Sequence, residues 1–208
     1  MGQNYSFISK RFSLHTSSKE LKDLAIAWLF ISIAFAIVQN GASFSSAFLI
    51  SIAISGFTVG IAFIFHEMSH KIVAQRYHCW AEFRADITML SLALLMSFLG
   101  FVFIAPGAVM IYGNVTKKQN GIISMAGPLT NIILAIILLP FALMLPFGVL
   151  ANHLVSYGFM INAWLALFNM IPFWNFDGAK IYSWSKTAYI IIIIAAAILV
   201  FFSFVRPL

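Results

Sequence analysis

The chain is organised around residues 47–70, which read AFLISIAISGFTVGIAFIFHEMSH. The stretch from Ala47 to Phe65 carries no charge, and the pentapeptide His66–His70 follows it directly. If this stretch is helical, His66 and His70 lie one turn apart on a single face. Two neutral imidazoles placed in this way can hold one zinc ion, and Glu67, turned about 100° from His66, can reach a water bound to the metal. The pattern is typical of a zinc hydrolase.

The same pentapeptide has a simpler interpretation, in which the two histidines cap an apolar helix near a membrane interface. However, an unpaired glutamate and two histidines buried in apolar sequence cost on the order of several kcal/mol unless something compensates them. A bound cation would supply that compensation.

The composition places the chain outside the range of soluble domains. Its 208 residues are 62% hydrophobic and only 9% charged, and the mean hydropathy is +0.98. We therefore predict one integral-membrane domain over residues 1–208, all-α and polytopic, with about five to six transmembrane helices. We also expect a short membrane-associated β-strand or re-entrant element.

The net charge of +6 does not indicate a nucleic-acid partner. The basic residues stand at segment ends, where they anchor membrane spans, and no basic stripe alternates with aromatic residues. The single cysteine, Cys79, excludes an internal disulfide. No cleavable signal is evident at the N-terminus.

Apolar and polar stretches divide the chain into consecutive segments. Within the third of them, Met89 to Phe98 is typical of a helix, whereas Gly100 to Tyr112 is β-prone and favours two extended pieces around Pro106-Gly107. The predicted segments are an interfacial lead (1–22), a first apolar segment (24–38), the zinc helix (47–77), the re-entrant strand region (87–115), the helices of the later motifs (121–178) and a last helix (187–205).

The distribution of Lys and Arg predicts the orientation. The lead is basic, the turn at residues 39–46 has no charge, and the stretch after the zinc helix is basic again. The positive-inside rule then places the N-terminus in the cytoplasm of a multi-pass cell-membrane protein. His66 and His70 lie toward the cytoplasmic end of their helix.

Catalytic zinc usually has three protein ligands and one open position. The candidates for the third ligand are Asp177, His153 and His78, with Glu82 and Asp86 as more distant possibilities. The last two and His78 lie in a charged run typical of an interface, and His153 begins a segment at its outer end. Asp177 follows a helix-breaking, uncharged stretch.

The path of residues 87–112 decides between these candidates. If this stretch crosses the membrane completely, His70 and Asp177 end on opposite faces. If it enters and returns, both lie on one face, and the charge count favours this case because it keeps Lys117, Lys118 and Lys180 in the cytoplasm. Non-helical backbone at membrane depth is allowed where it lines a cavity or is buried in protein.

Three separated motifs, in this order, resemble the site-2 protease family of intramembrane zinc metalloproteases. They are His66-Glu67-Met68-Ser69-His70, Ala126-Gly127-Pro128-Leu129-Thr130-Asn131, and Asn169-Met170-Ile171-Pro172 followed by Asp177-Gly178. The resemblance implies one zinc ion held by His66, His70 and Asp177, with Glu67 as the general base. It also implies that Asn169 and Asn131 contact the substrate or the oxyanion, and that membrane-associated strands lie between the first two motifs.

Two departures from the family limit what the resemblance implies. Many bacterial members carry a PDZ domain and others a CBS pair, and this chain has room for neither. Asp177-Gly178-Ala179 replaces the frequent Asp-Gly-Gly, which leaves the ligand unchanged. Regulation by an internal peptide-binding domain is therefore not expected.

The resulting hypothesis is a zinc endopeptidase that cleaves transmembrane protein substrates within or near their helices in the lipid bilayer. An alternative is a membrane metal-ion carrier that uses the His/Asp set for transit, although carriers usually show several acidic positions along a path. A prenyl-protein protease shares the His-Glu-x-x-His element, but it takes its third ligand from a glutamate, and no glutamate follows Glu82.

Overall fold

The computed structural model describes residues 14–43, 45–102, 106–144 and 147–205. Part of the predicted interfacial lead and part of the predicted strand region therefore lie outside the described residues. The elements are α1 (Ser18–Asn40), α2 (Ser46–Ser55), the π-helix η1 (Gly56–Gly60), α3 (Ile61–Arg76), β1 (Trp80–Ala85), α4 (Ile87–Ser97), β2 (Gly107–Tyr112), α5 (Lys117–Met144), α6 (Val149–Asn169), α7 (Asp177–Trp184) and α8 (Lys186–Val205).

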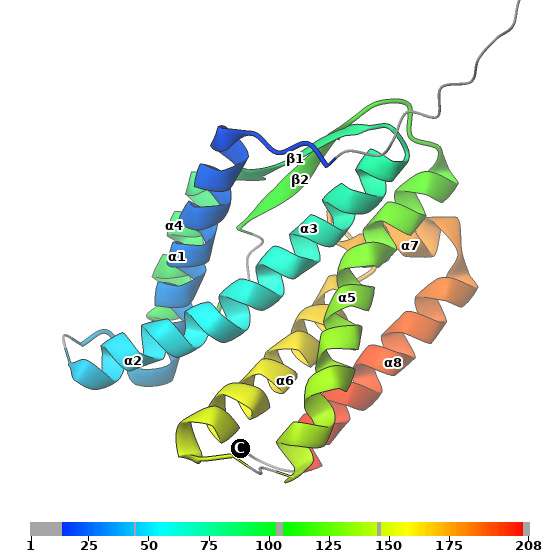
Figure 1. Ribbon diagram of the computed structural model, residues 1–208. Coiled ribbons are helices and arrows are strands. Elements are labelled where there is room, and N and C mark those ends of the chain that lie inside the picture. Colours follow the sequence, from blue (N-terminus) through cyan, green and yellow to red (C-terminus); the bar gives the residue numbers. More distant parts are fainter. Residues whose placement is uncertain (1–13, 44, 103–105, 145–146, 206–208) are drawn as a thin grey trace, which may run out of the picture.

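The described part of the chain is a polytopic, all-α membrane protein with a small sheet, which confirms the predicted fold class. Four helical stretches are long and apolar enough to cross a membrane, and the 21-residue α6 runs beside α5 (Figure 1). The four stretches are Ser18–Asn40, Ser46–Arg76, Lys117–Met144 and Lys186–Phe204.

Local sequence explains where several of these helices begin and end. The Ser17 hydroxyl accepts a hydrogen bond from the Glu20 amide at the start of α1, and Gly41, with φ of 67°, ends that helix. Pro128 and Pro140 lie inside α5, yet the helix continues through both. Neighbouring helices in a membrane protein can cover the backbone groups that a proline leaves unbonded, so the helix is bent or weakened rather than ended.

The sheet differs from the sequence-based expectation in its pairing. We expected two extended pieces between Gly100 and Tyr112; the second piece is β2, and its antiparallel partner is β1, with Trp80 opposite Tyr112 and Ala85 opposite Gly107. Phe101 and Val102 are not in a strand, and residues 103–105 lie outside the described part. Because β1 is separated from β2 by α4, this pairing has no local signature in the sequence.

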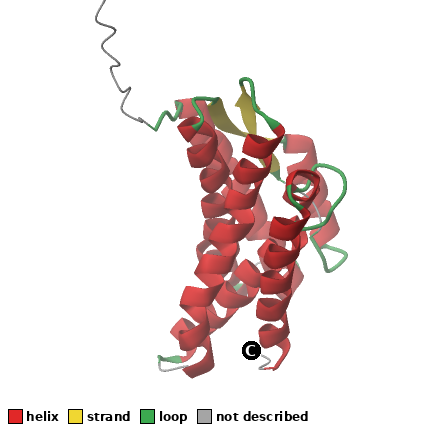
Figure 2. Cartoon of the chain, turned by 90° about the vertical axis from the view of Figure 1, so that its right-hand side faces the viewer, coloured by secondary structure: helices red, strands yellow, loops and turns green. Residues whose placement is uncertain are grey.

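The chain makes an excursion from the sheet after Ala85, through α4, and is back in the sheet at Gly107. The register places Ala85 next to Gly107, so the two ends of the excursion are adjacent. The helix between them, α4, has 11 residues and is about 16 Å long, roughly half the thickness of the hydrocarbon core. Figures 1 and 2 show the sheet at one end of the bundle and α4 descending beside the helices.

A buried ion pair fixes the sheet and α1 to the zinc helix. Lys71 and Glu20 are fully buried and form an ion pair, and the Lys71 ammonium also donates to the Thr16 hydroxyl at 2.8 Å. The second carboxylate oxygen of Glu20 accepts from the Phe83 amide in β1 at 3.0 Å. Lys71 can be buried because the carboxylate of Glu20, 51 residues earlier in the sequence, neutralises it.

Candidate metal centre

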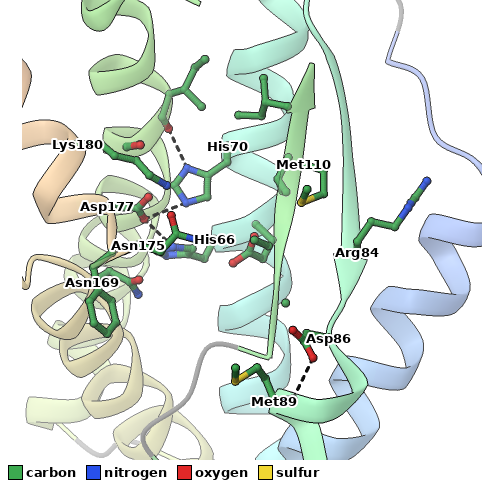
Figure 3. Close-up of a pocket in the computed structure, with 18 of the residues that line it drawn as sticks. His66, His70, Arg84, Asp86, Met89, Met110, Asn169, Asn175, Asp177 and Lys180 are labelled. Atoms are coloured by element: carbon green, nitrogen blue, oxygen red, sulfur yellow. Dashed lines mark hydrogen bonds and ion pairs between the residues drawn. The ribbon is translucent and has the colours of Figure 1, made fainter. Parts of the chain in front are cut away.

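The candidate metal ligands come from two helices, and their side chains converge (Figure 3). His66 and His70 project from one face of α3, and Asp177 is the first residue of α7. Their exposed fractions are only 4%, 7% and 8%. The Asp177 Oδ2 atom lies 3.2 Å from His66 Nε2 and 3.0 Å from His70 Nε2, and the three ligand atoms lie within 4.8 Å of one another.

Hydrogen bonds on the far side of each imidazole fix its tautomer. His66 Nδ1 donates to the Asn131 Oδ1 atom at 2.6 Å, and His70 Nδ1 donates to the Ile123 carbonyl at 2.8 Å. Each neutral ring then carries its proton on Nδ1 and turns the lone pair of Nε2 toward Asp177. Two imidazole lone pairs and a carboxylate oxygen thus converge with no N–H group between them. These are ligand atoms of the kind that a zinc ion binds.

The position of Asp177 favours the ionised carboxylate. Its Oδ2 atom faces both Nε2 atoms, at 3.2 and 3.0 Å, where an ionised carboxylate and two neutral imidazoles can share one cation. The first turn of a helix also favours a negative charge. Asp177 is therefore ready to act as an anionic ligand.

Asn131 lies behind His66 rather than in the cavity. Its side chain is fully buried, and its amide group donates to the Ala62 carbonyl at 3.3 Å and to Asn162 Oδ1 at 2.9 Å. Asn162 in turn donates to the Gly158 carbonyl at 2.8 Å. We expected Asn131 to contact substrate, whereas its hydrogen bonds are used to orient a metal ligand.

Sequence reasoning did not identify Asn162, which holds Asn131 in this orientation. An asparagine on the buried face of an apolar segment was the signal that could have found it, because a buried amide needs a hydrogen-bonding partner. The carbonyl of Ile123 carries no sequence signal at all.

A cavity of about 710 Å³ opens beside the ligands and is lined by Glu67, Asn169 and Lys180 in addition to the three ligands. Glu67 follows His66 on α3 and faces the cavity. Asn169, at the end of α6, donates one amide hydrogen to the Leu165 carbonyl at 2.9 Å, which leaves the other for a ligand. Residues 107–111 of β2 form the opposite wall. The cavity thus places a carboxylate base, an amide and an extended backbone beside the ligand set.

Gly127 gives the imidazoles the space that they occupy. A Cβ atom at this position of α5 would collide with the Nε2 atoms of both His66 and His70. The Gly-Pro motif therefore contributes a flat patch of helix backbone against which the two rings pack. Only glycine leaves the Nε2 atoms clear.

Three of the other candidates for the third ligand make different contacts. Asp86 accepts from the Met89 amide at 3.0 Å as the N-cap of α4, and Glu82 pairs with Arg84 and accepts from the Ser17 hydroxyl. His153 stacks on Tyr157, with 6.0 Å between the ring centroids. In the described ranges, the only group of at least three His, Cys, Asp or Glu side chains close enough to share an ion consists of His66, His70 and Asp177.

Comparison with known proteins gives one informative result. A protein of Methanocaldococcus jannaschii named "Putative zinc metalloprotease" is 41% identical to this chain over 180 residues, which cover 85% of this chain and 90% of that protein. The chain belongs to this zinc metalloprotease family. No profile of a known protein family matches the chain, and neither does any solved structure.

Family membership and geometry agree on the class of site. A metalloprotease needs a metal held by side chains with an open position, and the buried His66, His70 and Asp177 supply such a set. The spanning helices make this metalloprotease a membrane protein.

Proposed function

We propose that this metalloprotease is an intramembrane-cleaving enzyme of the site-2 protease type. It holds one zinc ion per chain and hydrolyses peptide bonds within or near transmembrane helices of membrane-protein substrates. The observation that carries this proposal is the position of His66, which lies about 15 Å from Arg76 along a helix that is long and apolar enough to cross a membrane. A protease whose ligands lie at this depth acts on a bond that enters the bilayer.

The residues around the ligand set can carry out hydrolysis. Zinc, when bound, lowers the pKa of a coordinated water and polarises the substrate carbonyl. Glu67 takes the proton of the attacking water and returns it to the leaving nitrogen. The remaining amide hydrogen of Asn169 can bind the substrate carbonyl oxygen as negative charge develops on it.

The free edge of β2 offers a binding site for an unwound substrate. The sheet in the described part has two strands, and residues 107–111 of β2 line the cavity, so the edge of β2 away from β1 lies beside the ligands (Figure 3). A substrate helix must open before its amide can be attacked, because its backbone hydrogen bonds shield the scissile bond. We propose that the opened segment pairs with β2 as an added strand.

Three of the four acidic residues other than Glu67 and Asp177 give no support to a metal carrier. Glu20 is paired with Lys71, Glu82 with Arg84, and Asp86 caps α4. These carboxylates are therefore engaged in structural contacts and do not form a path for an ion across the membrane.

The test of intramembrane cleavage uses the full-length protein in liposomes with a single-span protein substrate. We expect two products whose masses place the cut within the span or within a few residues of it, because two of the three ligands lie in a helix that is long and apolar enough to cross a membrane. A zinc chelator should stop cleavage and added zinc should restore it. Cleavage of soluble peptides together with an intact single-span substrate would contradict the proposal.

We further propose that the sheet and the metal centre lie toward the cytoplasmic face. The end of α3 and the start of α5 lie at the same end of the bundle as the sheet (Figure 1), and these termini carry Arg76 and Lys117. The turn from α1 to α2 lies at the opposite end and carries no charged residue. This distribution follows the positive-inside rule.

Single cysteines test this topology in a background with Cys79 replaced. A cysteine at Asn114 or Gln119 should react with an impermeant thiol reagent only from the cytoplasmic side, whereas one at Asn40 or Leu150 should react only from the opposite side. The expected contrast is all-or-none, because the two groups are separated by about one hydrocarbon thickness, roughly 30 Å. Labelling at Asn114 from outside would reverse the assignment.

A further inference from the structure

The zinc helix contains one irregular turn. Residues Gly56–Gly60 form a π-helical turn between α2 and α3, and this turn ends six residues before His66, about 9 Å along the helix. A π turn inserts one extra residue into an α-helix and therefore rotates everything after it by about 100° relative to an uninterrupted helix. The direction in which His66 and His70 point depends on this turn.

Trp28 of α1 binds the carbonyl that defines the π turn. Its indole N–H donates to the Gly56 carbonyl at 2.9 Å. The same carbonyl accepts the hydrogen bond from the Ile61 amide, five residues later, which is the bond that makes the turn π rather than α. The indole therefore stabilises the acceptor of the irregular bond.

The surface of the π turn is shaped to receive this indole. A Cβ atom on Gly56 would lie 2.8 Å from Trp28 Cζ2, and one on Gly60 would overlap the Cδ1 and Nε1 atoms of the ring. Ser32, one turn after Trp28 on α1, donates its hydroxyl to the Trp28 carbonyl at 2.6 Å. The two glycines thus allow the ring to lie directly on the backbone of the zinc helix.

We propose that Trp28 is a positioning residue for the metal centre. By holding the π turn, its indole fixes the rotation of α3 at which His66 and His70 face Gly127 and Asp177. If the Ile61 amide bonded the Phe57 carbonyl instead, as in a regular α-helix, both imidazoles would turn away by about 100°. The inference rests on the metal centre of the proposed function and does not depend on intramembrane cleavage.

The test compares Trp28→Phe with Trp164→Phe. The first substitution keeps an aromatic ring but removes the N–H that binds Gly56. The second removes an indole from α6 that is 41% exposed and contacts Phe204. Zinc affinity is measured by competition with a chelator, the ligand geometry by the absorption of the Co²⁺-loaded protein, and the turn itself by hydrogen–deuterium exchange of residues 56–66 in the metal-free protein.

We expect Trp28→Phe to weaken zinc binding by about tenfold or more, to change the Co²⁺ spectrum and to speed exchange in residues 56–66. Trp164→Phe should stay within about twofold of the unmodified protein in affinity, with the same spectrum and exchange. Equal affinity, spectrum and exchange in Trp28→Phe and the unmodified protein would overturn the proposal.

Gly60→Ala provides the second variant and decides the question if Trp28→Phe does not fold. Its methyl group displaces the indole while the tryptophan remains, so we expect the same weaker zinc binding and faster exchange as in Trp28→Phe. Zinc affinity and exchange like those of the unmodified protein would overturn the proposal. Failure of the unmodified protein to bind zinc would instead contradict the metal centre, and exchange in the metal-free protein would still test the role of Trp28.

Discussion

Glu67→Gln is expected to abolish peptide-bond cleavage while the protein keeps its fold and its zinc. Glutamine has the volume of glutamate but no basic carboxylate, and loss of a general base reduces the rate by about 10²- to 10⁴-fold. Glu67 lines the cavity and is not one of the three converging ligands, so metal binding should persist. The measurement is the rate of cleavage of a single-span substrate by equal amounts of zinc-loaded protein.

Asp86→Asn is the matched control for this prediction. Asp86 also lines the cavity, but its carboxylate caps α4, and asparagine caps a helix about as well as aspartate does. The control should therefore retain cleavage within a few-fold. Full cleavage by Glu67→Gln would remove Glu67 from the mechanism.

The second large effect is expected on metal content. The purified protein should contain about one zinc per chain, and the double variant His66→Ala, His70→Ala should contain almost none, because only Asp177 remains of the set. The matched control is the double variant His78→Ala, His153→Ala, which should keep its zinc. Elemental analysis of the detergent-solubilised proteins measures both, and an unchanged zinc content without His66 and His70 would exclude them as ligands.

Gly127→Ala tests the same centre without removing a ligand. Its methyl group would collide with the Nε2 atoms of both imidazoles, so we expect zinc content to fall nearly as far as in the double variant. Gly158→Ala is the control in a neighbouring helix, since its methyl group would meet the flexible end of Leu138 at 3.3 Å and Thr58 Cγ2 at an ordinary contact distance of 3.9 Å. Normal zinc content in Gly127→Ala would show that the rings do not pack on α5 as described.

Composition and local spacing were sufficient to predict the fold class and the pairing of the two histidine ligands. A chain that is 62% hydrophobic cannot expose so much apolar surface to water, so the sequence alone predicts a membrane protein. The pairing of His66 with His70 also follows, because the helical repeat places residues four apart on one face. For Asp177, the distribution of Lys and Arg between segments predicted the same membrane face as for the histidines. It did not predict a contact between these residues.

The remaining features depend on contacts between residues far apart in the sequence. Asn131 matched a motif, but its role in orienting His66 depends on Asn162 and Ala62, which lie in two other helices. β2 was predicted as extended, yet its partner β1 lies beyond α4. The buried position of Lys71 depends on Glu20, which lies 51 residues earlier in the sequence.

The π turn is the clearest case of what only the tertiary structure decides. The sequence shows two glycines in an apolar helix, and helical periodicity predicts a regular turn there. The structure adds Trp28 from another helix, whose indole binds the Gly56 carbonyl and packs on the backbone exposed by the glycines. Periodicity and composition describe a segment by itself, whereas the rotation of the zinc helix, and so the direction of its ligands, is set by a side chain that the helix does not contain.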